Sequence, residues 1–173
     1  DDLAVTDVLV LGTWSREEIL ARAAAAESGL SHPVATALVA TAARETGYSE
    51  PSELQRSRFR VGFGVVASVS GRPVLVGSRR LMAEEGIVLS PAVQDALDTA
   101  EARGASAILV ADDRQVQGVV QIEPRLRPEV YAVIRSLRDH DARQIYVVSG
   151  DSQGPTRLIA DLLELDAYFY EVL

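Results

Sequence analysis

The chain has 173 residues, which fits one ordinary domain or two small ones. With 47% hydrophobic and 24% charged residues it suits a packed globular core, and its net charge of -8 argues against nucleic acid or an anionic membrane surface as the main partner. It has no cysteine and every basic residue is arginine, which excludes disulfides, thiolate metal sites, Walker-type phosphate loops and Schiff-base enzymes.

The sequence shows no targeting or membrane-spanning segment. Its first residues are acidic, unlike those of a signal peptide. No apolar run approaches the roughly twenty residues that span a bilayer, so we expect a soluble polypeptide. His32 and His140 are its two histidines, and we expect no histidine-rich metal site.

The first elements along the chain are a strand and two helices. A run rich in Val and Leu over residues 4–11 predicts a short strand. Ser15 and Glu18 have the spacing of a capping box, which predicts a helix that ends near Glu27. A second helix is expected to begin at His32-Pro33, because proline is favoured at the first helical position, and to end at the next glycine.

The middle of the chain changes to the alternating pattern of strands. From Leu54 to Val76 apolar residues alternate with polar or small ones, and the Ser70-Gly71-Arg72-Pro73 segment predicts the turn of a hairpin. The other elements expected up to residue 122 are helices over residues 78–85 and 90–104 and strands over residues 107–111 and 116–122.

After this point strands and helices alternate, which predicts a parallel α/β architecture. The expected elements are a helix opening at Arg127-Pro128, a buried strand over residues 144–148, a helix over residues 156–163 and a strand from residue 168. We therefore predict two domains. Residues 1–120 form an α+β domain with an antiparallel sheet flanked by helices, and residues 121–173 form part of an α/β domain.

Three short constellations could carry chemistry. Glu27 with His32-Pro33 is either a plain helix cap or a histidine ring and carboxylate that together meet a flat heteroaromatic ligand with an exocyclic amine. Gly62-Phe63-Gly64-Val65 marks either a bulge or a place where a ligand lies against bare backbone. Ser149-Gly150-Asp151 follows a hydrophobic strand, where it is either a simple turn or a hydroxyl placed for a phosphoryl group.

In order and spacing these constellations resemble the heavy-metal-transporting P-type ATPases. The nucleotide-binding domain of that family carries a Glu, a Ser-Glu-His-Pro element, a Gly-x-Gly-Val element and a Val-Gly-Ser/Asn element. Asp-x-x-Arg-Pro and Thr-Gly-Asp segments of the phosphorylation domain follow. The matches, spread over essentially the whole chain, are Glu27, His32-Pro33, Gly62-Phe63-Gly64-Val65, Val76-Gly77-Ser78, Arg127-Pro128 and Ser149-Gly150-Asp151.

The resemblance implies a nucleotide-binding domain followed by part of a haloacid dehalogenase-like, Rossmann-like phosphorylation domain. It implies that His32 contacts adenine, with Glu27 near the amino edge of the base. Gly62 and Gly64 would let the nucleotide approach the strand, and Val65 would lie against the base.

The resemblance also implies a nucleotide contact at Ser78 and, on the phosphoryl side, contacts at Ser149 and Asp151. Ser78 stands where relatives often have asparagine, Ser149 replaces the threonine that contacts the transferred phosphoryl group, and Asp151 would lie close to the nucleotide. The parent would bind ATP or ADP, with Mg²⁺ held mostly by ligands outside this chain. It would pass the γ-phosphoryl to an aspartate preceding residue 1 and so drive metal transport, with actuator and transmembrane domains as its other partners.

The chain also departs from the family pattern. Ser31 stands where glutamate is usual, Pro124 stands where aspartate is expected with Glu123 beside it, and the Asp-Lys-Thr-Gly-Thr and Gly-Asp-Gly-x-Asn-Asp motifs do not occur. We therefore expect a cytoplasmic part of an integral cell-membrane protein that binds nucleotide without turnover. A non-enzymatic nucleotide-binding module stays open as an alternative. A haloacid dehalogenase-type phosphatase is less favoured, because it needs a lysine and an Asp-x-Asp motif at a strand end.

Overall fold

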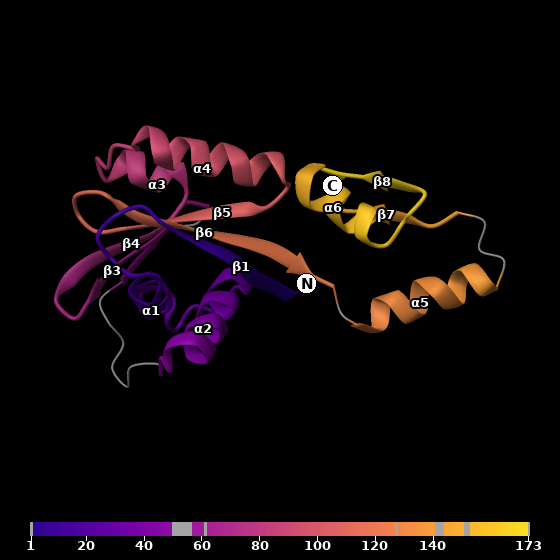
Figure 1. Cartoon of the computed structure of the whole chain (residues 1–173), viewed down its shortest axis with the longest axis horizontal. Helices are drawn as coiled ribbons and strands as arrows, with labels where there is room; N and C mark the ends of the chain where they lie inside the picture. The colour runs from indigo at the N-terminus through magenta and orange to yellow at the C-terminus, as the bar shows by residue number, and fades with distance from the viewer. Residues whose placement is uncertain are drawn as a thin grey trace.

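Helices and strands follow one another in two patterns along the chain (Figure 1). The computed structural model describes residues 2–49, 57–60, 62–126, 128–140, 144–150 and 153–172. The elements in chain order are β1 (Asp2–Val10), α1 (Arg16–Glu27), α2 (Pro33–Thr46), β2 (Ser57–Arg60), β3 (Gly64–Val69), β4 (Arg72–Gly77), α3 (Arg79–Glu84), α4 (Pro91–Ala102), β5 (Ser106–Ala111), β6 (Val116–Arg125), α5 (Pro128–Asp139), β7 (Tyr146–Val148), α6 (Gln153–Leu162) and β8 (Ala167–Phe169).

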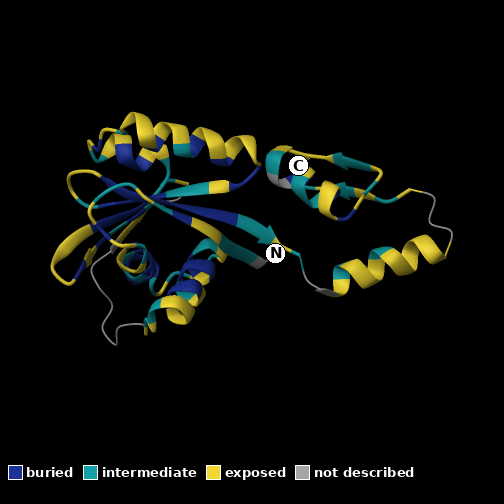
Figure 2. Ribbon diagram, in the orientation of Figure 1, coloured by how far each residue is buried: buried dark blue, intermediate teal, exposed yellow. Residues whose placement is uncertain are grey.

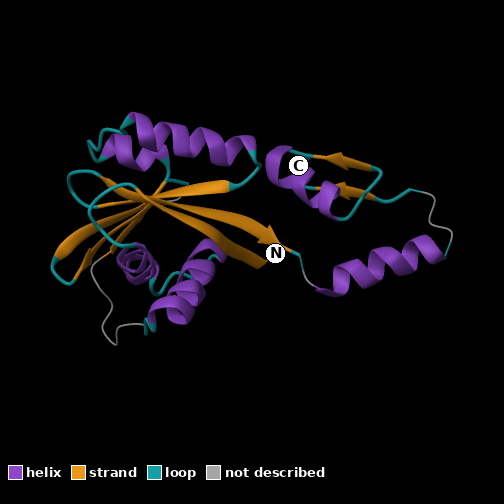
Figure 3. Ribbon diagram, in the orientation of Figure 1, coloured by secondary structure: helices purple, strands orange, loops and turns teal. Residues whose placement is uncertain are grey.

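An antiparallel sheet of six strands, in the order β1-β6-β5-β4-β3-β2, carries the first part of the molecule. Helices α1 and α2 cover one face and α3 and α4 the other (Figures 1 and 3). The alternation of side chains along β4 separates the two hydrophobic cores, because Val74 and Val76 pack on the side of α1 and α2 whereas Leu75 packs on the side of α3 and α4. The predicted α+β class is confirmed.

The predicted helix starts are also confirmed. Ser15 caps α1 in a full capping box with Glu18, and His32 caps α2 with Pro33 in the first turn. The hairpin between β3 and β4 turns on Ser70 and Gly71, whose φ angles of 51° and 75° match a tight two-residue turn. Arg72 and Pro73, which we placed in the turn, begin β4 instead.

Strand β6 is longer than the sequence predicts. It pairs with β1 as far as Arg125, opposite Asp2, so the border that we expect after residue 120 falls inside a strand of the sheet. The division of the chain into domains at that residue stays a prediction.

The last part of the chain forms a parallel β7–α6–β8 unit, as the alternating pattern predicts. The prediction of a buried strand over residues 144–148 is wrong: β7 spans Tyr146–Val148, and Tyr146 and Val148 are 47% and 62% exposed (Figure 2). This second sheet has two described strands, and α6 packs against them. Its strands therefore have fewer neighbouring elements to cover their side chains than the strands of the six-stranded sheet have. Leu54 and Arg127, the expected starts of a strand and a helix, lie outside the described residues.

In the part of the chain that the structure describes, every helix is too short or too polar to cross a membrane. Helix α5 confirms the expected element but leaves Tyr131, Val133 and Leu137 exposed (Figure 2).

Buried Gln117 ties the segment between β1 and α1 to β6. Its Oε1 accepts from the backbone N–H groups of Thr13 at 2.8 Å and Trp14 at 3.2 Å, and its Nε2 donates to Asp112 Oδ2 at 2.7 Å. A Cβ at Gly12 would lie 2.1 Å from that Oε1, so the chain passes Gln117 too closely for any side chain there. This one amide therefore fixes the approach to the helix that carries Glu27.

Replacing Gln117 with leucine should destabilise the fold. The change leaves two backbone donors unsatisfied, which corresponds to a loss of about 2–4 kcal/mol in the free energy of unfolding. Urea denaturation followed by the fluorescence of Trp14, the one tryptophan of the chain, measures it. Gln115→Leu makes the same chemical change at an exposed position and should cost less than about 0.5 kcal/mol. Equal losses in the two variants would contradict the role given to Gln117.

Candidate functional site

The connection between α1 and α2 places the His32 ring beside the carboxyl group of Glu27. As the cap of α2, His32 accepts the backbone N–H of Ala35 at Nδ1 over 3.3 Å. A neutral ring with this contact carries its proton on Nε2, the atom that lies 3.0 Å from Glu27 Oε2. The helix cap therefore fixes both the position of the ring and the edge that it turns toward Glu27.

The Glu27 carboxyl is buried, with the residue 3% exposed, and this burial raises its pKa to about 7. Although Oε2 and Nε2 lie close together, their alignment does not meet hydrogen-bond geometry, and both buried atoms are without a hydrogen-bond partner in the described structure. Unpaired buried polar atoms are rare in folded proteins. The carboxyl and the imidazole N–H thus form an incomplete polar contact below the surface, and the ring of His32, with its side chain 34% exposed, is the accessible part of the pair.

Phe59 is a site residue that sequence reasoning missed. Its ring centroid lies 5.7 Å from that of His32, with the ring planes tilted by 33°, and the residue is 46% exposed. Phe59 stands opposite Val65 in the β2–β3 pairing, so its side chain points to the face of α1 and α2. The alternation of apolar residues predicts that Phe59 points to that face. The β2–β3 register that brings it to His32 cannot be predicted from the sequence.

Val65 lies beneath the site rather than on its surface. It is fully buried in the core formed with α1 and α2. The core covers the side chain of Val65, and the expectation that Val65 lies against a base stays a prediction.

Gly62 and Gly64 are required by the backbone itself. Gly62 has a φ of 76° in the turn that the N–H of Phe63 closes on the carbonyl of Arg60, and a Cβ there would meet nothing within 4 Å. Gly64 has a φ of 134°, and a Cβ there would lie 2.2 Å from the carbonyl oxygen of Val76. The strand pair needs Gly64 for close approach, whereas Gly62 leaves open backbone on the surface.

Ser78 fastens the Gly62–Gly64 loop to α3. Its Oγ donates to the carbonyl of Phe63 at 3.1 Å, and it also caps α3. The guanidinium of Arg80 lies 4.4 Å from the centre of the Phe63 ring, a cation–π contact that sequence reasoning missed. Ser78 is thus well explained as a structural residue, and the exposed cation beside the loop is Arg80.

Ser149, one of the two residues expected on the phosphoryl side, lies in the β7–β8 unit. Ser149 follows β7, where its backbone N–H donates to the carbonyl of Phe169 and its carbonyl accepts from Val172. Asp151 lies outside the described residues. The structure therefore brings together Glu27 and His32, and separately Gly62, Gly64 and Ser78, whereas Ser149 belongs to the β7–β8 unit. Among the described residues no three His, Asp or Glu side chains are grouped to hold a metal ion.

Comparison with known proteins assigns the family. A family model described as haloacid dehalogenase-like hydrolase matches residues 5–173. The chain therefore belongs to the haloacid dehalogenase-like hydrolase family.

Curated relatives of the chain include metal-transporting P-type ATPases. It is 33% identical over 171 residues to a probable copper-exporting P-type ATPase V of Mycobacterium tuberculosis, covering 99% of this chain and 22% of the relative. It is 27% identical to a zinc-exporting P-type ATPase of Mycobacterium marinum, covering 98% and 23%.

Solved structures agree with this relationship. A zinc-transporting PIB-type ATPase in the E2.Pi state matches with a TM-score of 0.79 and 26% identity, over 99% of this chain and 27% of that one. The N-domain of HMA6, a copper-transporting P-type ATPase, matches with a TM-score of 0.58 and 27% identity, over 71% of this chain and all of the domain. The resemblance to heavy-metal P-type ATPases is confirmed. The chain spans about a fifth of the length of the curated relatives it matches.

The raised pKa of Glu27 makes stability depend on pH. Between the ordinary value of 4.5 and about 7 the folded protein holds a proton that the unfolded chain has released, so the stabilisation present below pH 4.5 is lost as pH rises through 7. Between pH 5 and pH 8 we expect a loss of about 2.5 kcal/mol in the free energy of unfolding that Glu27→Gln abolishes.

Denaturation curves at the two pH values measure this difference. Glu129→Gln alters an exposed glutamate of α5 and should keep the wild-type pH dependence. A Glu27→Gln protein with the wild-type slope would contradict the pKa shift.

Proposed function

We propose that this chain is the ATP-binding region of a heavy-metal-transporting P-type ATPase. The observation that carries the proposal is the Glu27–His32 pair, in which a buried carboxyl and an imidazole 3.0 Å away both lack a hydrogen-bond partner within the described residues. They belong to the two residues to which the resemblance gives the adenine contacts. The names of the relatives support a transport ATPase as the parent.

The chemistry of the pair suits an adenine edge. Adenine offers a donor, its exocyclic amine, beside an acceptor, a ring nitrogen. A carboxyl with a pKa of about 7 is present in both forms near neutral pH: the protonated form donates to the ring nitrogen and accepts from the amine, and the ionised form accepts from the amine. The side chain of His32 is 34% exposed and its ring lies near Phe59, so the two rings offer stacking surface for the base.

The phosphates would run from the Gly62 turn toward the β7–β8 unit. The open backbone at Gly62 permits close approach, and Arg80, held on Phe63, supplies a positive charge at this loop. Ser149, at the carboxyl end of β7, would contact the transferred phosphoryl group, with Asp151 close by. Mg²⁺ bound with the nucleotide would neutralise charge on the phosphates, and its protein ligands would come mostly from beyond these residues.

For the parent we propose a phosphoprotein of the cell membrane. This region would face the cytoplasm and work with actuator and transmembrane domains, and ATP hydrolysis through an aspartyl-phosphate would drive metal transport. Because these 173 residues contain no Asp-Lys-Thr-Gly-Thr motif, this chain by itself would hold the nucleotide without cleaving it.

Nucleotide binding can be tested with a matched pair of histidine variants. Titration of ATP into the ¹⁵N-labelled chain should shift the amide signals of His32, Gly62 and Gly64. His32→Asn keeps a capping side chain but removes the ring, and it should weaken binding about tenfold to a hundredfold, the usual loss for one base–ring stacking contact. His140→Ala removes the other histidine, at an exposed position, and should bind like the wild type. The proposal fails if ATP shifts none of the three amides or if His32→Asn binds unchanged.

The chain should bind ATP without hydrolysing it. Incubation with γ-labelled ATP and Mg²⁺ should release no phosphate above the protein-free background and leave no acid-stable label on the chain. Release of phosphate, or a hydroxylamine-sensitive label, would instead support the haloacid dehalogenase-type phosphatase. A non-enzymatic module predicts the same binding by this chain. A transport assay of the whole parent protein separates the two possibilities, because metal transport that His32→Asn lowers together with ATP binding identifies a pump.

A further inference from the structure

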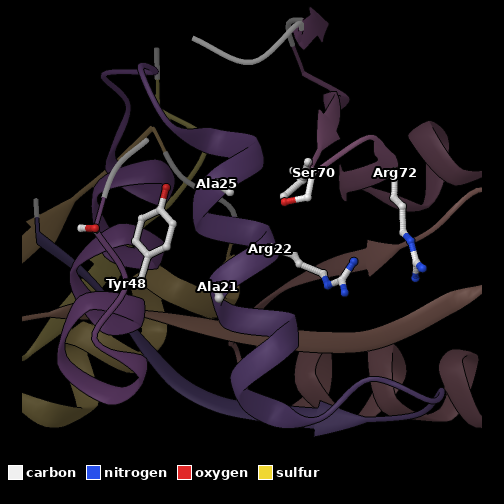
Figure 4. A pocket seen from close by; sticks show the side chains of 8 residues that line it. Ala21, Arg22, Ala25, Tyr48, Ser70 and Arg72 are labelled. Carbon is white, nitrogen blue, oxygen red and sulfur yellow. The ribbon is translucent and has the colours of Figure 1, made fainter. Parts of the chain in front are cut away.

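A groove of about 530 Å³ lies between α1, the residues after α2 and the turn of the β3–β4 hairpin (Figure 4). It shares no lining residue with the candidate nucleotide site. Val69, at the groove, lies at the opposite end of β3 from Gly64, about 17 Å away at the ordinary rise of a strand. The groove is therefore a separate feature of the same sheet.

The groove offers hydrogen-bond donors and no carboxylate among its described lining residues. Arg22 and Arg72 supply guanidinium groups, Ser49 and Ser70 supply hydroxyl groups, and Tyr48 contributes its ring, since its own hydroxyl is buried. The chain has 25 acidic residues against 17 basic ones, so a lining with two cations and no acid runs against its overall charge. Two smaller cavities, of about 370 and 290 Å³, both include Glu101.

The two arginines differ in how they are held. The guanidinium of Arg22 stacks 4.3 Å from the centre of the Trp14 ring and lies 3.5 Å from Glu18, which fixes its position. Arg72, in contrast to Arg22, forms no ion pair with an acidic side chain in the part of the chain that the structure covers. Arg22 extends from α1 on the side of the groove that carries Arg72 (Figure 4). One preorganised and one unpaired guanidinium thus border the same space.

We propose that this groove binds a phosphate group. Guanidinium groups match the oxygens of phosphate in bidentate fashion, and hydroxyl groups complete the donor set for its remaining lone pairs. Ala21 and Ala25 form a floor of small side chains between Tyr48 and Arg22, which leaves room for the body of a phosphate monoester beside the Tyr48 ring (Figure 4). This binding site does not depend on the nucleotide site proposed above.

Titration of inorganic phosphate into the ¹⁵N-labelled chain tests the proposal. The amide signals of Ala21, Arg22 and Ser70 should shift with saturation, and the affinity should fall as NaCl is raised. Arg72→Ala should weaken binding about tenfold or more, because it removes a charge-assisted contact. Arg72 is exposed, so this variant should stay folded. Arg72→Lys, which keeps the charge but loses the planar fork, should fall between the two.

Arg114→Ala is the matched control, because it removes one positive charge at an exposed turn outside the groove. It should bind phosphate like the wild type. The proposal is overturned if Arg114→Ala and Arg72→Ala weaken binding equally, since that would show a general charge effect. It is also overturned if phosphate shifts the signals of Ser149 and Gly150 and none in the groove.

A second arm identifies the source of the phosphate. Phosphatidylcholine vesicles with and without phosphatidic acid are sedimented with the wild type and with Arg72→Ala. Retention that needs both the phosphatidic acid and Arg72 assigns the groove to a lipid headgroup. Groove signals that shift with inorganic phosphate, without retention on vesicles, assign it to a soluble phosphate compound. Retention that Arg72→Ala leaves unchanged would contradict the groove as the membrane contact.

Discussion

The candidate site depends on the position of one carboxyl group, that of Glu27, at the Nε2 edge of the His32 ring. Glu27 is the last residue of α1 and His32 is the cap of α2, so the two helix ends fix both groups at once. Burial of the carboxyl is unfavourable in its charged form, and the pKa of about 7 shows the resulting shift toward the neutral acid. Oε2 and Nε2 approach to 3.0 Å without completing a hydrogen bond, so a ligand with a neighbouring donor and acceptor would have to turn one of the two groups outward to pair with it. Satisfying such groups discriminates strongly between ligands, because a ligand without the matching atoms leaves them buried and unpaired.

The glycine-rich loop shows how a structural need and a binding surface coincide. Gly64 and Gly77 face each other across β3 and β4, and a Cβ on either would collide with the backbone of the other strand. Of Gly62, Gly64 and Gly77, Gly62 is the one that has open space around it. The same pattern of glycines therefore serves two purposes, close strand packing at one position and free access at the other. Ser78 joins them by holding the loop carbonyl of Phe63 against α3.

Local sequence rules predict most of this fold. The capping box at Ser15, the proline after His32 and the turn at Ser70 depend on residues within one turn of chain. The two helix starts are as predicted, and the turn is confirmed at Ser70 and Gly71 although β4 begins earlier than expected. What could not be predicted depends on contacts between distant segments. The meeting of Phe59 with His32 requires the β2–β3 register as well as the packing of α2, and neither is encoded in spacing.

The same reason accounts for the errors. Val148 is as apolar as Val65, yet it is 62% exposed while Val65 is fully buried. Hydrophobicity predicts a strand, but the number of layers around the strand decides its burial, and periodicity carries no information on that number. The structural role of Gln117 was missed because its partners, Thr13 and Trp14, lie more than a hundred residues earlier in the chain.

Helix α1 links the two features that the structure places on this side of the sheet. It carries Arg22 at the groove and Glu27 at its carboxyl end, about 8 Å apart along the helix axis. The β3–β4 hairpin likewise runs from the groove at Ser70 to the close contact at Gly64. Ligands bound at the two proposed places would contact the same two elements, and any coupling between them would be reciprocal: whatever factor a bound phosphate imposed on nucleotide affinity, the nucleotide would impose on phosphate affinity. Since α1 is held at its start by the contact of Gln117 with Trp14 and has a buried carboxyl at its end, the groove and the Glu27–His32 pair depend on the placement of the same helix.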